Sequence, residues 1–165
     1  MSLASTAGAK YSVRKTLTVE TSAERAFRVF TEEHGVWWPL ATHHIGKLPA
    51  RTVIIEPAQG GRWYEQGEDG SECDWGRVLV WDPPHRLVLA WQLTADWQFD
   101  PSFVTEVELR FFPESDRRTR VEFEHRNLEA YGAKTDTVRE MVGAPDGWPT
   151  ILEKFVGFAN QAGRQ

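Results

Sequence analysis

The segment DGWPTILEKFVGFANQ, residues 146–161, decides the fold of this chain. Its apolar side chains recur at spacings of three and four residues, which is the period of one face of an α-helix. They are Trp148, Ile151, Leu152, Phe155, Val156 and Ala159. A helix with so broad an apolar stripe needs a large apolar surface to cover, and the face of a β-sheet is the only candidate in the rest of the chain.

The residues before this helix predict such a sheet. Apolar and β-branched segments alternate with turn signals, which are Gly60-Gly61, Asp69-Gly70, Pro83-Pro84 and the PESD stretch at 113–116. Strands joined by such short connections must be antiparallel neighbours, because parallel pairs need a long crossover. The expected strands are 51–57, 61–66, 73–81, 86–93, 103–112 and 118–127.

The N-terminal part predicts one more strand and a helix. Residues 13–20 alternate between apolar and polar side chains, which is typical of a strand with one buried face. Thr21 and Glu24 have the spacing of a capping box, so we expect a helix over residues 22–34. Tryptophan, histidine and proline are frequent in residues 36–46, which predicts a segment that is irregular or only briefly helical.

Length and composition favour a single α+β domain. A chain of 165 residues has the usual size of one domain, and its 41% hydrophobic and 26% charged residues are typical of globular proteins. We expect the domain at residues 12–163 and a flexible N-terminus at residues 1–11. The predicted fold is a curved antiparallel sheet of about six to seven strands, wrapped around the long C-terminal helix.

Charge and cysteine content argue against several classes of partner. The net charge is −5 and the basic residues are scattered, so we expect no nucleic-acid partner. No apolar stretch has the length of a membrane span or signal peptide, so we expect no membrane association and a cytoplasmic location. The lone cysteine, Cys73, fits a reducing compartment. No glycine pattern for phosphate or dinucleotide binding occurs, and we expect no cofactor.

Eight tryptophans are the unusual feature of the composition. Large flat side chains fill cores, but they also make good walls for ligand cavities, and both interpretations are open for each tryptophan. Strand alternation and the helix stripe select the side chains that face the space between sheet and helix. The predicted ligand-binding residues are Trp37, Trp38, His43, His44, Trp63, Leu89, Trp91, Phe123, His125, Trp148, Leu152 and Phe155.

Histidines are the main candidate polar groups. His125 ends an apolar row, where it is either a satisfied core residue or a group that anchors a ligand or transfers a proton. His43 and His44 lie near His34, but adjacent histidines on an extended segment point apart and no paired-cysteine or HExxH spacing occurs. We therefore expect no metal site. Glu65 shares a strand face with Trp63, and we expect it at the rim of the cavity.

Several motifs together resemble the family related to the C-terminal domain of the activator of Hsp90 ATPase, within the START-like or helix-grip superfamily. The resemblance extends over roughly residues 12–163. The motifs are GGRWYEQ (60–66), EDGSECDWGRVLVWDPPHRLVLAW (68–91), VTEVELRFF (104–112), TRVEFEHRNL (119–128) and DGWPTILEKF (146–155).

The resemblance implies three functions. The first is binding of a small hydrophobic or aromatic molecule between the sheet and the C-terminal helix, which the many aromatic residues and the apolar helix stripe also favour; some similar bacterial proteins are linked to stress or detoxification. The second is a cyclase-like or hydratase-like enzyme that uses a pocket histidine or carboxylate. The third is interaction with the chaperone Hsp90, although the chaperone activator has an N-terminal domain for which this chain has no room. The chain is expected to be a monomer or a homodimer.

Overall fold

The computed structural model describes residues 11–164, so the predicted flexible N-terminus lies outside the described residues except for Tyr11. Within that range, seven strands form one antiparallel sheet in the order β1-β7-β6-β5-β4-β3-β2. The strands are β1 (Val13–Val19), β2 (Ala50–Ile55), β3 (Arg62–Gly67), β4 (Glu72–Asp82), β5 (Arg86–Trp91), β6 (Thr105–Ser115) and β7 (Arg118–Arg126).

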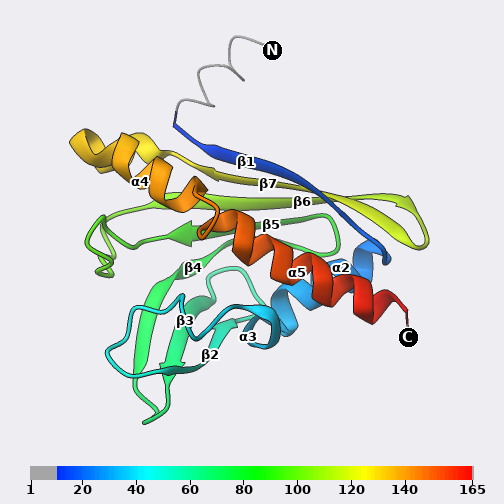
Figure 1. The fold of residues 1–165 in the computed structure, drawn as a ribbon, viewed down its shortest axis with the longest axis horizontal. Coiled ribbons are helices and arrows are strands. Elements are labelled where there is room, and N and C mark those ends of the chain that lie inside the picture. The colour runs from blue at the N-terminus through cyan, green and yellow to red at the C-terminus, as the bar shows by residue number, and fades with distance from the viewer. Residues whose placement is uncertain (1–10, 165) are drawn as a thin grey trace.

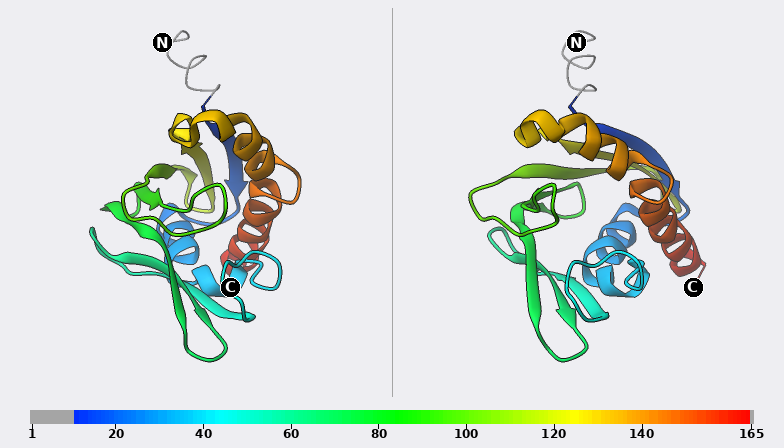
Figure 2. Two further views of the ribbon diagram at one scale, coloured as in Figure 1. Left: turned by 90° about the vertical axis from the view of Figure 1, so that its left-hand side faces the viewer. Right: turned by 60° about the vertical axis from the view of Figure 1, so that its left-hand side comes forward.

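The helices lie on one face of this sheet. They are α2 (Ala23–Glu32), α3 (His34–Trp37), the 3₁₀ helix η1 (Leu128–Lys134), α4 (Thr135–Gly143) and α5 (Trp148–Gly163). In Figure 1, α5 runs across the sheet, with α2 and α3 near its C-terminal half. Figure 2 shows that the sheet curves around these helices. The predicted α+β fold, a curved antiparallel sheet around a long C-terminal helix, is confirmed.

The apolar stripe of α5 is buried as predicted. Trp148, Ile151, Leu152, Phe155 and Ala159 face the sheet and α2, and each is at most 5% exposed. Burying a large apolar side chain stabilises a fold by about 1.5–3 kcal/mol, so this stripe is a major part of the core. It therefore fixes the C-terminal helix against the concave face of the sheet.

The start of α2 differs from the prediction by one residue. Ser22 is the N-cap, and its hydroxyl accepts a hydrogen bond of 3.2 Å from the backbone N–H of Arg25. The predicted capping box of Thr21 and Glu24 is wrong because Thr21 is buried and its carbonyl accepts from the Thr119 hydroxyl at 2.8 Å. The pairing with β7 thus decides which residue is free to cap the helix.

Two bulges in β4 change which of its side chains face the helices. Trp75 is an extra residue against β3, and Leu79 is an extra residue against β5. Each bulge reverses the alternation, so Trp75, Val78 and Trp81 all face the concave side. Without the bulge at Leu79, alternation from Val78 would put Val80 there instead of Trp81. Trp81 packs edge-on against Phe27 of α2, with ring centroids 5.1 Å apart.

The outer face of the sheet is charged. Glu108 is buried there beneath three arginines. Its carboxylate accepts hydrogen bonds from the guanidinium groups of Arg110 at 3.0 Å, Arg126 at 2.5 Å and Arg86. Burial raises the pKa of Glu108, but the three arginine bonds outweigh it and hold this pKa below its usual value. Within residues 11–164, no helix combines the length and apolar character needed to cross a membrane.

Candidate ligand-binding cavity

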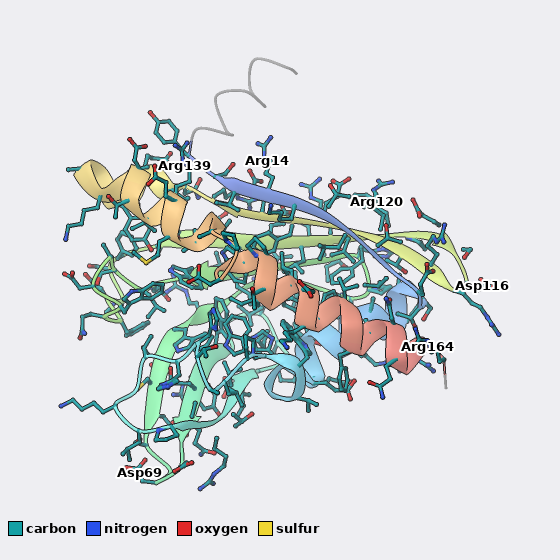
Figure 3. All side chains as sticks on the ribbon, viewed as in Figure 1. Arg14, Asp69, Asp116, Arg120, Arg139 and Arg164 are labelled. Atoms are coloured by element: carbon teal, nitrogen blue, oxygen red, sulfur yellow. The ribbon has the colours of Figure 1, made fainter. Side chains whose placement is uncertain are left out.

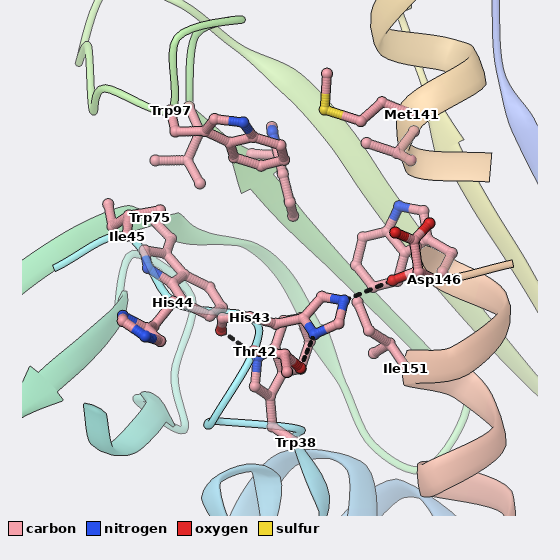
Figure 4. Close-up of a pocket in the computed structure, with 15 residues that line it drawn as sticks. Trp38, Thr42, His43, His44, Ile45, Trp75, Trp97, Met141, Asp146 and Ile151 are labelled. Atoms are coloured by element: carbon pink, nitrogen blue, oxygen red, sulfur yellow. Dashed lines mark hydrogen bonds between the residues drawn. The ribbon is translucent and has the colours of Figure 1, made fainter. Parts of the chain in front are cut away.

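A cavity of about 330 Å³ lies beside the N-terminal end of α5 (Figure 4). Its volume is at the lower end of the range for small-molecule sites. Four parts of the chain line it: the loop of residues 38–49, the facing parts of β4 and β5, the loop after β5, and the segment from α4 to α5. The lining residues are Trp38, Thr42, His43, His44, Ile45, Trp75, Trp91, Leu93, Trp97, Met141, Val142, Asp146, Gly147, Trp148 and Ile151.

The loop of residues 38–49 forms one wall of the cavity, and Glu65 holds it in place. The Glu65 carboxylate accepts hydrogen bonds from the backbone N–H groups of Ile45 at 2.6 Å and Gly46 at 3.0 Å, and from the Trp75 indole at 2.9 Å. Glu65 is only 1% exposed, so its predicted position at the rim is wrong. Burial of this carboxylate is tolerated because three donors surround it.

His43 joins the same loop to the segment before α5. Its Nε2 atom lies 2.6 Å from the carbonyl oxygen of Asp146, and its Nδ1 atom lies 2.7 Å from the Thr42 hydroxyl. A carbonyl oxygen only accepts, so Nε2 carries the proton. Figure 4 shows this bond bridging the two sides of the cavity.

His125 lies in the packed interior next to the cavity, without lining it. Its Nδ1 accepts from the Trp148 indole at 3.1 Å, so Nε2 carries the proton and donates to the Thr105 hydroxyl at 2.9 Å. Thr105 in turn donates to the Trp91 carbonyl. Burial lowers the pKa of His125 to about 3. A neutral ring with both nitrogens satisfied is a structural core group, which is one of the two interpretations that the sequence left open.

His34 is the second buried histidine. Its Nε2 accepts from the Trp63 indole at 3.2 Å, and its Nδ1 donates to the Phe30 carbonyl at 3.0 Å. Burial lowers its pKa to about 3. His34 therefore does not meet His43 and His44 at the cavity, and no group of three histidine, cysteine, aspartate or glutamate side chains within residues 11–164 is arranged to hold a metal ion.

The structure divides the twelve predicted ligand-binding residues into two groups. The cavity wall contains Trp38, His43, His44, Trp91 and Trp148. The other seven lie in the interior next to the cavity. His125 is a buried polar group there, and the hydrophobic core contains Trp37, Trp63, Leu89, Phe123, Leu152 and Phe155. Four of these seven make edge or tilted ring contacts with the wall, such as Trp63 with Trp75 at 5.4 Å and Phe123 with Trp148 at 4.6 Å. The other two of the four are Trp37 and His125, and together these four residues support the wall from behind.

Trp97 is the most informative wall residue that the sequence did not select. Its φ is +61°, a left-handed conformation that favours glycine, and its side chain is 39% exposed. The turn is closed by Trp97 N–H donating to the Thr94 carbonyl at 2.9 Å. Strained backbone combined with an exposed large aromatic ring is typical of functional positions. No spacing signal in the sequence marks this turn, because glycine is the residue expected there.

Comparison with known proteins gives one family and several solved structures. The model of the family described as activator of Hsp90 ATPase homolog 1-like protein matches residues 20–160. The structure of "An anthrahydroquino-Gama-pyrone synthase Txn09 complexed with SUM" is 36% identical, with 90% of this chain and 97% of that chain covered and a TM-score of 0.63. The self-sacrificing resistance protein CalC from Micromonospora echinospora is 32% identical, with 93% and 96% covered and a TM-score of 0.70.

A more distant match bears on the predicted chaperone partner. The Hsp90 activator PFC0360w from Plasmodium falciparum is 18% identical, with 71% of this chain and 73% of that chain covered and a TM-score of 0.50. Likeness at this level shows a shared fold alone. The search of curated proteins gave no significant match. Interaction with Hsp90 therefore stays a prediction.

Proposed function

Because the chain belongs to the activator of Hsp90 ATPase homolog 1-like family, we propose that its cavity binds a small, flat aromatic molecule. One observation carries the proposal: five of the eight tryptophans, Trp38, Trp75, Trp91, Trp97 and Trp148, line a single cavity. Flat rings stack well on flat rings, and stacking contributes about 0.5–1.5 kcal/mol beyond the area that it buries. The volume of about 330 Å³ fits a few fused rings.

The two relatives above 30% identity support this proposal and suggest its purpose. One is a synthase named after an anthrahydroquino-γ-pyrone, a fused-ring compound, which supports a polycyclic aromatic ligand. The other is named as a resistance protein, which supports a protective role in which the bound molecule is withheld from other targets. A single domain over residues 12–163 and a cytoplasmic location belong to the same proposal, and the lone cysteine supports that location.

Replacing Trp97 by glycine separates binding from folding. Glycine relieves the left-handed backbone, so we expect the free energy of unfolding to stay within about 1 kcal/mol of wild type. Loss of a stacking ring should weaken binding of three-ring aromatic compounds about tenfold, as measured by isothermal titration calorimetry. The matched control is Phe112→Ala, since Phe112 stacks on Arg120 away from the cavity. Equal affinity of the Trp97 variant and wild type would count against the proposed function.

A second candidate is an enzyme of the cyclase kind, and the 36% identity to a synthase favours it. His125 is unsuited to proton transfer because it is enclosed and both its nitrogens are bonded. His44 is better placed: its Nδ1 donates to the Gly46 carbonyl at 3.1 Å, which leaves Nε2 for a ligand. Conversion of a bound polyketide by wild type, but not by His44→Gln with unchanged affinity, would favour the enzyme over the binding protein.

A further inference from the structure

We propose that the molecule bound in this cavity is a cation, most simply a flat aromatic ring system that carries a protonated amine. The inference rests on the proposed aromatic site and adds the charge of its ligand. The charge follows from two sets of atoms in the cavity wall: those that already form hydrogen bonds within the protein, and those that remain available to a ligand.

The indole N–H groups of the wall are largely occupied by protein partners. Trp38 donates to the His43 carbonyl at 2.9 Å, and Trp75 donates to Glu65. Trp91 donates to the Tyr131 hydroxyl at 3.1 Å, and Trp148 donates to His125. These four rings therefore line the cavity without offering a free N–H donor to a ligand. The faces of indole rings carry negative electrostatic potential and attract cations.

The polar atoms that remain on the cavity side chains are mainly acceptors. His44 keeps Nε2 as an acceptor when its Nδ1 proton is bonded to the Gly46 carbonyl. The Thr42 hydroxyl donates to His43 Nδ1, which leaves its oxygen lone pairs. Asp146 contributes a carboxylate, which Figure 4 places on the opposite side of the cavity from Trp75. Among the wall tryptophans, only Trp97 has an indole N–H without a hydrogen bond within residues 11–164.

The charges around the cavity favour the same ligand. No lysine or arginine is among the described residues that line it, and no basic side chain within residues 11–164 forms an ion pair with Asp146. The chain as a whole carries a net charge of −5. An anionic ligand would meet a carboxylate, acceptor atoms and negative ring faces, whereas an ammonium group would find partners in all three. Aromatic walls with a carboxylate at the edge are the chemistry that recognises organic cations.

Three compounds with one ring system test the charge directly. They are 9-aminoacridine, which is a cation at neutral pH, acridine, which is neutral, and acridine-9-carboxylate, which is an anion. We expect 9-aminoacridine to bind the wild-type chain about tenfold more tightly than acridine, and the carboxylate to bind most weakly. Asp146→Asn should bring 9-aminoacridine close to the affinity of acridine. The matched control is Asp116→Asn, which makes the same change of net charge at the end of the β6–β7 hairpin (Figure 3) and should leave the difference intact.

The outcomes separate this inference from the proposed function. Equal affinity for the three acridines, or tightest binding of the carboxylate, would overturn the cation and leave the aromatic cavity standing. The inference would also be overturned if Asp146→Asn still bound 9-aminoacridine about tenfold more tightly than acridine. The carboxylate of Asp146 would then not be the partner of the ligand's positive charge. Failure of all three compounds to bind wild type would contradict both.

Discussion

We expect the protein to lose about 4 kcal/mol of its free energy of unfolding when the pH falls from about 6 to about 4.5, before most carboxylates titrate. The cause is the pair of buried histidines, His34 and His125, whose pKa values burial lowers to about 3. In the unfolded chain both protonate near pH 6.5. Below that pH the unfolded state binds protons at both histidines and the folded state does not. The free energy of unfolding therefore decreases as the pH is lowered. Chemical denaturation at a series of pH values measures this loss.

Variants assign the acid sensitivity to particular rings. In His125→Gln only His34 remains, and we expect the slope of stability against pH to fall to about half in this window. His85→Gln is the control, because His85 is exposed and its removal should leave the slope unchanged. A flat wild-type profile, or an unchanged slope in the His125 variant, would show that these rings are not held neutral in the folded protein.

Replacing Glu65 by alanine has the second large effect. It leaves the half-buried N–H groups of Ile45 and Gly46 and the buried Trp75 indole without their acceptor. Each buried donor without a partner costs about 1–3 kcal/mol, so we expect a loss of about 4 kcal/mol in the free energy of unfolding. Ligand affinity should fall at least about tenfold, because the loop of residues 38–49 loses its anchor to the sheet.

Glu68→Ala is the matched control for this change. Glu68 is exposed in the turn after β3, and its removal should change stability by no more than about 0.5 kcal/mol. Thermal unfolding and calorimetric titration of both variants give the comparison. If Glu65→Ala kept wild-type stability and affinity, the carboxylate would not be the anchor of the cavity wall.

Periodicity was sufficient to predict the fold. The apolar stripe of α5 and the turn signals between strands specify a helix on an antiparallel sheet, and both depend only on local spacing. The bulges at Trp75 and Leu79 could not be predicted, because a bulge is decided by pairing with strands far along the chain. One inserted residue was enough to exchange Val80 for Trp81 on the inner face.

The cavity was harder to predict than the fold. A row of inward-facing side chains is the same pattern whether it fills a core or lines a cavity, so Phe123 and Phe155 could not be distinguished from Trp91 and Trp148. The distinction depends on where loops cover the helix and sheet. Trp97 lies on such a loop, and only its backbone conformation reveals it.

The direct test of the aromatic cavity is an assigned ¹H–¹⁵N NMR spectrum of the tryptophan indoles, recorded while 9-aminoacridine is added. The cavity places a bound ring next to Trp38, Trp75, Trp91, Trp97 and Trp148, so their signals should shift or broaden. The signal of Trp81, which packs under α2 outside this cavity, should stay in place. Changes centred on Trp81, or no change in the five wall signals at saturating compound, would contradict the account.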